Sequence, residues 1–167
     1  PCLGSNLVAQ YLFNADAGTL TANSPASVAT AGGAGPRHLA FHPNGRIVYL
    51  LNETASTLTT LDVDPGTGKL TPRGTVNARA PGASGNNTGA EVQVHPSGRF
   101  VYSSNRGDDE IAIYAVSPDA GSVTRIGAQG SGVVTPRHFS LVPGGEFMLV
   151  ASQGNGTVQT MRVGLDG

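Results

Sequence analysis

Cysteine and charged residues are both scarce in this chain of 167 residues. The single cysteine, Cys2, excludes an internal disulfide and a metal site built from several thiolates. Charged residues make up 13%, about half of the usual share of about 25%, and ten basic against eleven acidic residues leave a net charge of −1. This balance excludes a general basic surface for nucleic acid or anionic membranes. No apolar run approaches the ~18 residues needed to cross a bilayer, so we expect neither nucleic acid nor a membrane as a partner.

Long segments with the spacing of apolar residues that is typical of helices are absent as well. The chain consists of short runs that alternate apolar with other residues and are rich in β-branched and aromatic side chains. Dipeptides typical of tight turns separate neighbouring runs at Asn44-Gly45, Ser97-Gly98 and Gly144-Gly145. The sequence therefore predicts an all-β chain of short antiparallel strands.

Three segments of the chain repeat one another with fixed internal offsets. Pro43, Pro96 and Pro143 mark the three copies and lie 53 and 47 residues apart. In every copy, the strand that follows the marker proline ends nine residues after it. A period near 50 with four strand signals per repeat is typical of a β-propeller, whereas a β-sandwich would show this similarity only by accident.

The repeats predict about three and a half four-stranded blades of a β-propeller, in one partial domain over residues 1–167. Residues 1–30 would end one blade, residues 36–79 and 90–130 would form two whole blades, and residues 135–167 most of a fourth. Propellers close with about 4–8 blades, so this arc cannot form a normal ring alone. We therefore expect the chain to be part of a longer protein, whose missing blades would be its partners.

Propeller topology brings one set of polar residues to the same face of the predicted ring. The innermost strand of a blade begins on the face where the next strand ends, close to the central channel. The ionisable residues at these positions are Arg37, His38, Glu53, Glu91, Arg106, Arg137 and His138, with Asn52 and Asn105 beside them. They would either form a binding and catalytic cluster or tie neighbouring blades together through Arg–Glu pairs.

The remaining polar residues have simpler interpretations. His42 and His95 precede a turn on the opposite face, and we expect them to support that turn. The acidic run at residues 108–110 lacks the alternate spacing of a calcium loop, which favours a solvated connection, and no metal site is predicted. Residues 82–89 form an insertion before Glu91 and are a candidate for a loop that covers a substrate.

Four stretches of the repeats carry a more specific pattern. They are Gly-Pro-Arg-His-Leu-Ala-Phe-His-Pro-Asn-Gly-Arg (35–46), Tyr-Leu-Leu-Asn-Glu (49–53), Ala-Glu-Val-Gln-Val-His-Pro-Ser-Gly-Arg-Phe-Val-Tyr-Ser-Ser-Asn-Arg-Gly (90–107) and Thr-Pro-Arg-His-Phe (135–139). Together they resemble the lactonase family of seven-bladed propellers, which includes propeller-type 6-phosphogluconolactonases and fungal carboxy-muconate cyclases. The resemblance extends over essentially the whole chain, and it implies that the chain is about half of a seven-bladed ring.

The resemblance also implies a site in the mouth of the channel. The positions that match the family are Arg37, His38, Glu53, Glu91, Arg106 and Arg137. The fourth repeat departs from the pattern, because Gln153 stands where the first two repeats have Glu53 and Arg106. The implied activity is that of a lactone hydrolase, most closely a 6-phosphogluconolactonase, which converts 6-phosphoglucono-lactone into 6-phosphogluconate. A muconate-type lactonising cyclase and a non-catalytic propeller that binds a ligand are the alternatives.

Lactone hydrolysis assigns a role to each of these residues. Glu53 or Glu91 is expected to activate a water, and His38 or Arg106 to stabilise the oxyanion. The substrate anion would be held by the remaining residues, Arg37, Arg137, His138, Asn52 and Asn105. This chemistry requires neither a metal nor an organic cofactor. We expect a cytoplasmic protein whose partner is a small sugar lactone or another anionic substrate.

Overall fold

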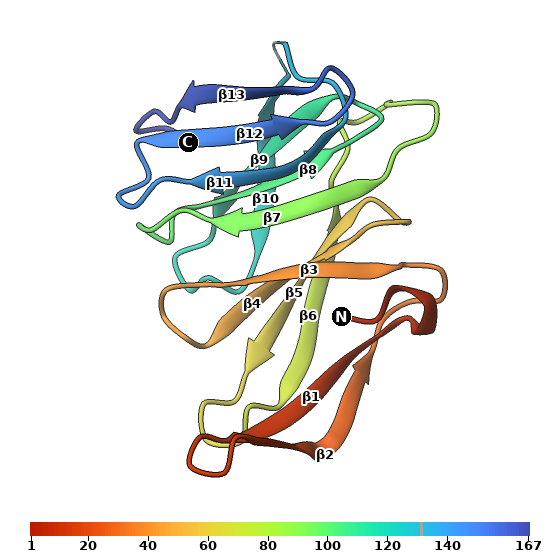
Figure 1. Cartoon of the computed structure of the whole chain (residues 1–167), viewed down its shortest axis with the longest axis vertical. Coiled ribbons are helices and arrows are strands. Elements are labelled where there is room, and N and C mark those ends of the chain that lie inside the picture. The colour runs from red at the N-terminus through yellow and green to blue at the C-terminus, as the bar shows by residue number, and fades with distance from the viewer. Residues whose placement is uncertain (131) are drawn as a thin grey trace.

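The chain folds into four separate antiparallel sheets that follow one another along the molecule (Figure 1). The computed structural model describes residues 1–130 and 132–167. A short 3₁₀ turn, η1 (Leu3–Ser5), precedes the first sheet, which contains β1 (Leu7–Asn14) and β2 (Thr19–Ala29). The second sheet contains β3 (Pro36–Phe41), β4 (Ile47–Asn52), β5 (Thr57–Val63) and β6 (Leu70–Asn77). The third contains β7 (Gly89–Val94), β8 (Phe100–Asn105), β9 (Glu110–Val116) and β10 (Val123–Gln129), and the fourth β11 (Pro136–Leu141), β12 (Phe147–Ser152) and β13 (Thr157–Arg162).

Strands that are consecutive in sequence are hydrogen-bonded neighbours within each sheet. The first strands of the last three sheets, β3, β7 and β11, lie against one another, whereas β6 and β10 lie at the far edges of their sheets (Figure 1). Each of these sheets is therefore one blade with its first strand innermost, and the prediction of an all-β arc of propeller blades is confirmed. Among the described residues, no helix has the length and apolar character needed to cross a membrane.

The second strand of each complete blade is buried along its whole length. All six residues of β4 and all six of β8 are buried, because neighbouring sheets cover both faces of these strands. Tyr49 and Leu51 of β4 pack toward the third sheet, in one cluster with Val92 and Tyr114. The alternate residue Leu50 packs toward the first sheet instead. Burial on both faces explains why these strands begin as continuous apolar runs in the sequence.

Two histidines support the turns on the face opposite the candidate site. His42 Nδ1 accepts the N–H of Asn44 at 3.1 Å, and His42 Nε2 lies 3.1 Å from the carbonyl oxygen of Gly98 in the next blade. His95 Nδ1 accepts the N–H of Ser97 at 3.1 Å in the same way. The prediction that these histidines support turns is confirmed, and His42 also joins two neighbouring blades.

The acidic run that follows β8 is not the solvated connection expected from the sequence. Asp108 forms an ion pair with Arg79 at 2.7 Å, and the Asp109 carboxylate accepts the N–H of Thr135 at 2.6 Å. These partners lie in the connections before β7 and before β11, 29 and 26 residues away. The interpretation from sequence was wrong because such distant partners are not visible in a local spacing pattern.

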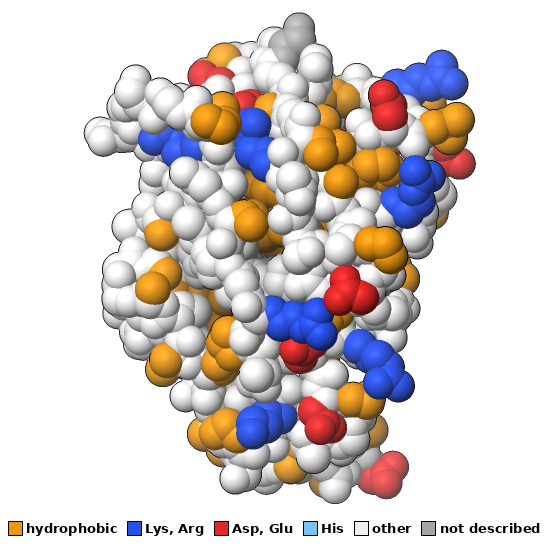
Figure 2. Space-filling view, turned by 180° about the vertical axis from the view of Figure 1, so that it is seen from behind, with side chains coloured by type: hydrophobic (Ala, Val, Ile, Leu, Met, Phe, Trp, Pro, Cys, Tyr) orange, Lys and Arg blue, Asp and Glu red, His pale blue; other side chains and the backbone are white. Residues whose placement is uncertain are grey.

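Charged side chains of both signs are mixed on the surface. Figure 2, seen from behind the view of Figure 1, shows Lys and Arg beside Asp and Glu, with apolar side chains between them. On the described surface in this view, neither sign forms a continuous patch. Arg73, for example, contacts Asp62 of its own blade at 2.9 Å and Asp119 of the next blade at 3.1 Å.

Two sheet faces carry exposed apolar side chains. Phe13 and Leu20 are paired across the first sheet and are 68% and 65% exposed, with Tyr11 on the same face. On the fourth sheet, Phe147 and Leu149 are 44% and 42% exposed. These two faces look away from the rest of the arc, and their apolar character predicts that they associate with further protein surface.

Candidate active site

The predicted ionisable residues lie where the inner strands begin and the second strands end. Arg37 and His38 are at the start of β3, and Glu53 directly follows β4. The hydrogen bond from the Glu53 N–H to the Gly35 carbonyl, at 2.7 Å, holds these two strand ends together. Glu91 occupies the corresponding part of β7, next to the end of β8. The local strand pairing of each blade therefore presents its polar residues at one edge of the arc.

Arg37, Glu53 and Arg106 form a cluster between the second and third blades. Arg37 Nη1 contacts Glu53 Oε2 at 2.8 Å, and Arg106 Nη2 donates to Glu53 Oε1. Arg37 Nε also donates to the carbonyl of Ala90 in β7 at 2.8 Å. All three charged side chains are less than 20% exposed. Two guanidiniums and one carboxylate leave this cluster with one net positive charge, which an anionic ligand can balance.

The pKa of Glu53 reflects its two arginine partners. Partial burial alone would raise this pKa, but the hydrogen bonds from Arg106 and Arg37, together with their charges, lower it below the ordinary value of 4.5. Glu53 is therefore a firmly ionised carboxylate with weak affinity for a proton. Such a group orients cations well but is a poor general base.

Glu91 joins two histidines from the blades on either side of it. Glu91 Oε2 lies 2.5 Å from His138 Nδ1 and 3.1 Å from His38 Nδ1, and Oε1 accepts the N–H of Val92 at 2.9 Å. The Glu91 side chain is only 8% exposed, whereas those of His38 and His138 are 40% and 60% exposed. Only the His138 contact has the geometry of a hydrogen bond, and a neutral His138 that donates from Nδ1 to the carboxylate has a free lone pair on Nε2.

Arg137 lies beside the cluster of His38, Glu91 and His138. Its side chain makes no hydrogen bond or ion pair with the described residues, and it is exposed next to His138. A hollow of about 340 Å³ is lined by both residues together with Gln153 and neighbouring parts of β12 and β13. Arg137 is thus a guanidinium available for an anion. In the described part of the chain, no group of three or more His, Cys, Asp or Glu side chains is arranged to hold a metal ion.

Comparison with known proteins now decides the family. Residues 1–166 match the family described as "Lactonase, 7-bladed beta-propeller". The chain belongs to this lactonase family. The resemblance inferred from the sequence motifs is therefore confirmed.

Curated relatives and solved structures agree with this assignment. The 6-phosphogluconolactonase of Pectobacterium carotovorum is 35% identical over 92% of this chain and 46% of its own length, and that of Serratia proteamaculans is 33% identical over 95% and 47%. A crystal structure of a protein from Lactobacillus plantarum has a TM-score of 0.91 at 33% identity, covering 98% of this chain and 47% of that one. The periplasmic gluconolactonase of Pseudomonas aeruginosa has a TM-score of 0.83 at 31% identity, covering 97% and 50%. The lactonase-family chain thus spans about half of the length of the relatives it matches.

Two asparagines predicted to bind substrate lie apart from the ionisable clusters. Asn52 donates to the hydroxyls of Thr57 and Thr59 at 3.0 and 2.9 Å, and Asn105 donates to the Ala78 carbonyl at 2.9 Å. Both side chains are buried, at 2% and 0% exposure. In this lactonase-family chain we therefore leave both out of the site that we propose.

One residue that supports Glu91 was missed by the sequence reasoning. The Glu91 N–H donates to the hydroxyl of Ser104, a fully buried residue of β8, at 3.0 Å. The other two repeats have Leu51 and Ala151 at this position of the strand. A polar residue at a position that is apolar in the other blades is the signal that would have found it.

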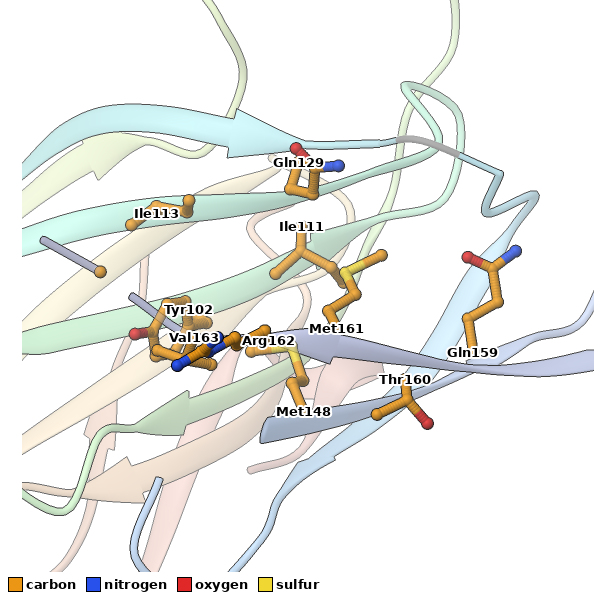
Figure 3. A pocket seen from close by; sticks show the side chains of 11 residues that line it. Tyr102, Ile111, Ile113, Gln129, Met148, Gln159, Thr160, Met161, Arg162 and Val163 are labelled. Carbon is orange, nitrogen blue, oxygen red and sulfur yellow. The ribbon is translucent and has the colours of Figure 1, made fainter. Parts of the chain in front are cut away.

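One cavity of this lactonase-family chain is lined by none of the predicted site residues. A space of about 370 Å³ lies between the third and fourth sheets. Figure 3 shows Tyr102 and Ile111 on one side of it and Met148 and Met161 on the other. These four residues also belong to the apolar cluster between the two sheets, so this space is part of the packing between blades.

The low pKa of Glu53 predicts how stability depends on pH. A carboxyl group with a lower pKa in the folded than in the unfolded state stabilises the fold above its unfolded pKa, near 4.5, and this contribution is lost as the pH falls through the folded value. We expect Glu53→Gln to destabilise the protein by about 2 kcal/mol at neutral pH, because it leaves two guanidiniums without their carboxylate.

Thermal unfolding of the full-length protein between about pH 7 and about pH 3 checks this prediction. The melting temperature of the Glu53→Gln variant should fall less steeply with acid than that of the parent protein. Asp62→Asn is a matched control, because Asp62 also pairs with an arginine but is 40% exposed. Equal acid sensitivity of the parent and Glu53→Gln would contradict the predicted role of Glu53.

Proposed function

We propose that this chain carries part of the active site of a lactone hydrolase that resembles 6-phosphogluconolactonase. The observation that carries the proposal is the bridge of Glu91 between His38 and His138, beside the arginine-rich cluster around Glu53. The names of the curated relatives support the same activity. The substrate would be 6-phosphoglucono-lactone and the product 6-phosphogluconate.

The water that opens the lactone needs a base close to the carbonyl carbon. Glu53 is unsuited, because two arginines lower its pKa. Glu91 is unsuited as well, because its two oxygens already accept hydrogen bonds from Val92 and His138, Oε2 also lies 3.1 Å from His38 Nδ1, and its side chain is nearly buried. We therefore assign the base to Nε2 of His38 or His138, with Glu91 fixing the tautomer of His138 through its hydrogen bond and lying 3.1 Å from Nδ1 of His38.

The proposed reaction then follows from these protonation states. The imidazole takes a proton from water as its oxygen bonds to the lactone carbonyl carbon, and the resulting oxyanion is stabilised by a guanidinium, for which Arg137 is placed. When the ring C–O bond breaks, the imidazolium returns the proton to the departing ring oxygen. The product carries a new hydroxyl group and a carboxylate, whose proton goes to solvent.

The phosphate of the substrate is assigned to the cluster of Arg37, Glu53 and Arg106. Its net positive charge and its forked donors suit a phosphoryl group. We assign the protein to the cytoplasm, because phosphorylated sugars are charged and do not cross bilayers unaided. The Pseudomonas aeruginosa relative is described as periplasmic, so preference for an unphosphorylated lactone would favour that compartment instead.

Steady-state kinetics of the full-length protein test the proposal. We expect kcat/KM for the phosphorylated lactone to exceed that for gluconolactone by about tenfold or more. Arg106→Lys should raise KM for the phosphorylated lactone about tenfold and change kcat little, because an ammonium cannot reproduce the forked contact. Turnover of a carboxy-muconate in place of either sugar lactone would support the cyclase, and absence of turnover with all three would support a binding module.

A further inference from the structure

The connection between β6 and β7 is an insertion that is fixed to the next blade. It comprises residues 78–88, whereas the connection between β2 and β3 comprises only residues 30–35. It lies on the same face as the ionisable clusters, because it leads into the innermost strand β7. The sequence marks it as a candidate cover for the site, but it does not show what holds the segment.

Arg79 clamps the insertion at its beginning. Its Nε and Nη2 donate to the two oxygens of Asp108 at 2.8 and 2.7 Å, and its Nη2 and Nη1 donate to the carbonyls of Ser84 and Gly85 at 2.7 and 3.0 Å. The side chains of Arg79 and Asp108 are only 16% and 17% exposed. One guanidinium thus joins the insertion to the turn that follows β8.

Asn87 clamps the insertion near its end. Asn87 Oδ1 accepts the N–H groups of Gly107 and Asp108 at 2.8 and 3.1 Å, and Nδ2 donates to Ser56 and Asn105 at 2.9 and 3.0 Å. All hydrogen-bonding positions of this amide are therefore used. At Gly107 a Cβ atom would lie 2.0 Å from the carbonyl oxygen of Asn86, so the backbones approach too closely for any side chain.

Arg106 directly precedes Gly107 and Asp108, the two residues that Arg79 and Asn87 hold. Its backbone N–H donates to the Thr88 carbonyl at 3.0 Å, and its Nη2 donates to the Gly89 carbonyl at 3.3 Å as well as to Glu53. The Gly89 N–H in turn donates to the Glu53 carbonyl at 3.0 Å. Arg106 Nε is buried and has no partner among the described residues. Glu53 and Gly89, the first residue of β7 directly after the insertion, are thus the described contacts that orient this guanidinium.

We propose that the insertion is a positioning element for Arg106, and that Arg79 and Asn87 act through it to set the affinity for phosphorylated substrates. The inference rests on the proposed function, in which Arg106 binds the phosphate. Releasing the insertion removes the contact of the Thr88 carbonyl with the Arg106 backbone and frees the adjoining Gly89, whose carbonyl contacts the guanidinium, so that the guanidinium leaves its orientation. The effect is specific for the phosphate, because the cluster of His38, Glu91 and His138 makes no described contact with the insertion.

Arg79→Met tests the proposal, since it keeps the length of the side chain and removes every donor. The matched control is Arg73→Met, because Arg73 also joins the second and third blades through two carboxylates but makes no described contact with the insertion. In the full-length protein, Arg79→Met should raise KM for the phosphorylated lactone about tenfold and leave kcat and gluconolactone kinetics unchanged. The control should change neither substrate, and Asn87→Ala should behave like Arg79→Met.

Two further measurements do not depend on turnover. Hydrogen exchange should accelerate in residues 84–89 and 106–108 of Arg79→Met, and the affinity for inorganic phosphate should fall about tenfold relative to Arg73→Met. If the parent protein hydrolyses no lactone, the proposed function fails, while exchange and phosphate binding still decide the positioning role. Unchanged exchange would overturn the inference. A released insertion with unchanged phosphate affinity, or an equal loss with both lactones, would overturn it too.

Discussion

Glu91→Gln is expected to lower kcat for lactone hydrolysis about 10²- to 10⁴-fold in the full-length protein. The amide has the same shape as the carboxylate, but it carries no charge and would direct an N–H₂ group toward one of the two imidazoles. His138 would then lose the acceptor that fixes its tautomer, His38 would lose the neighbouring carboxylate, and a ring with its proton on Nε2 cannot act as a base there. Single-turnover kinetics at saturating substrate measure the effect on the chemical step.

Variants of three histidines show whether a loss of turnover in Glu91→Gln comes from the proposed site. His38→Asn and His138→Asn identify the base, because only loss of the base should lower kcat as far as Glu91→Gln does. His95→Ala is the control on the opposite face, where it should reduce stability and leave turnover per folded molecule intact. Turnover that is lost in folded His95→Ala but kept in Glu91→Gln would show that the site has been assigned to the wrong face.

The isolated chain of 167 residues is expected to self-associate in solution rather than to exist as a monomer. Phe13 and Leu20 on the first sheet, and Phe147 and Leu149 on the fourth, expose apolar faces at the two ends of the arc. Sheet faces of this kind gain free energy when another surface covers them. Sedimentation velocity should therefore detect species of two or more chains.

Substitutions on these two faces distinguish self-association through the faces from general insolubility of the chain. Phe13→Lys combined with Leu149→Lys should shift the population toward the monomer. Phe41→Lys is the control, because Phe41 is 58% exposed at the end of β3 and lies on neither face. A monodisperse parent chain with a sharp, cooperative melting transition would show instead that the arc is a self-sufficient domain.

The fold could be predicted from the sequence because its signals are local. Each repeat carries its own turn, and residues such as His42 and Asn44 that shape the turn lie two positions apart. The short runs between the turns are rich in β-branched and aromatic residues, which indicates strands from a few residues. Repetition of these local signals was sufficient to predict a propeller.

The pairings within the site could not be predicted in the same way. Topology placed Arg37, Glu53 and Arg106 on one face, but a long arginine side chain can reach several carboxylates, and its choice depends on the packing between blades. Alignment also placed Asn52 at the end of a strand. The alternation of β4 turns this side chain to the side of Leu50, between the blades, because strand position alone does not fix the direction of a side chain.

The sharing of one carboxylate by three blades has a consequence for biosynthesis. Glu91 comes from β7 and needs His38 from the preceding blade and His138 from the following one, so the bridge is complete only when all three have docked. A chain emerging from the ribosome could close the His38 contact early, yet the second imidazole is synthesised 47 residues after Glu91. Until then this carboxylate would be shielded by one partner only. The proposed site of the nascent protein is therefore assembled only when the fourth sheet docks, however stable the earlier blades have already become.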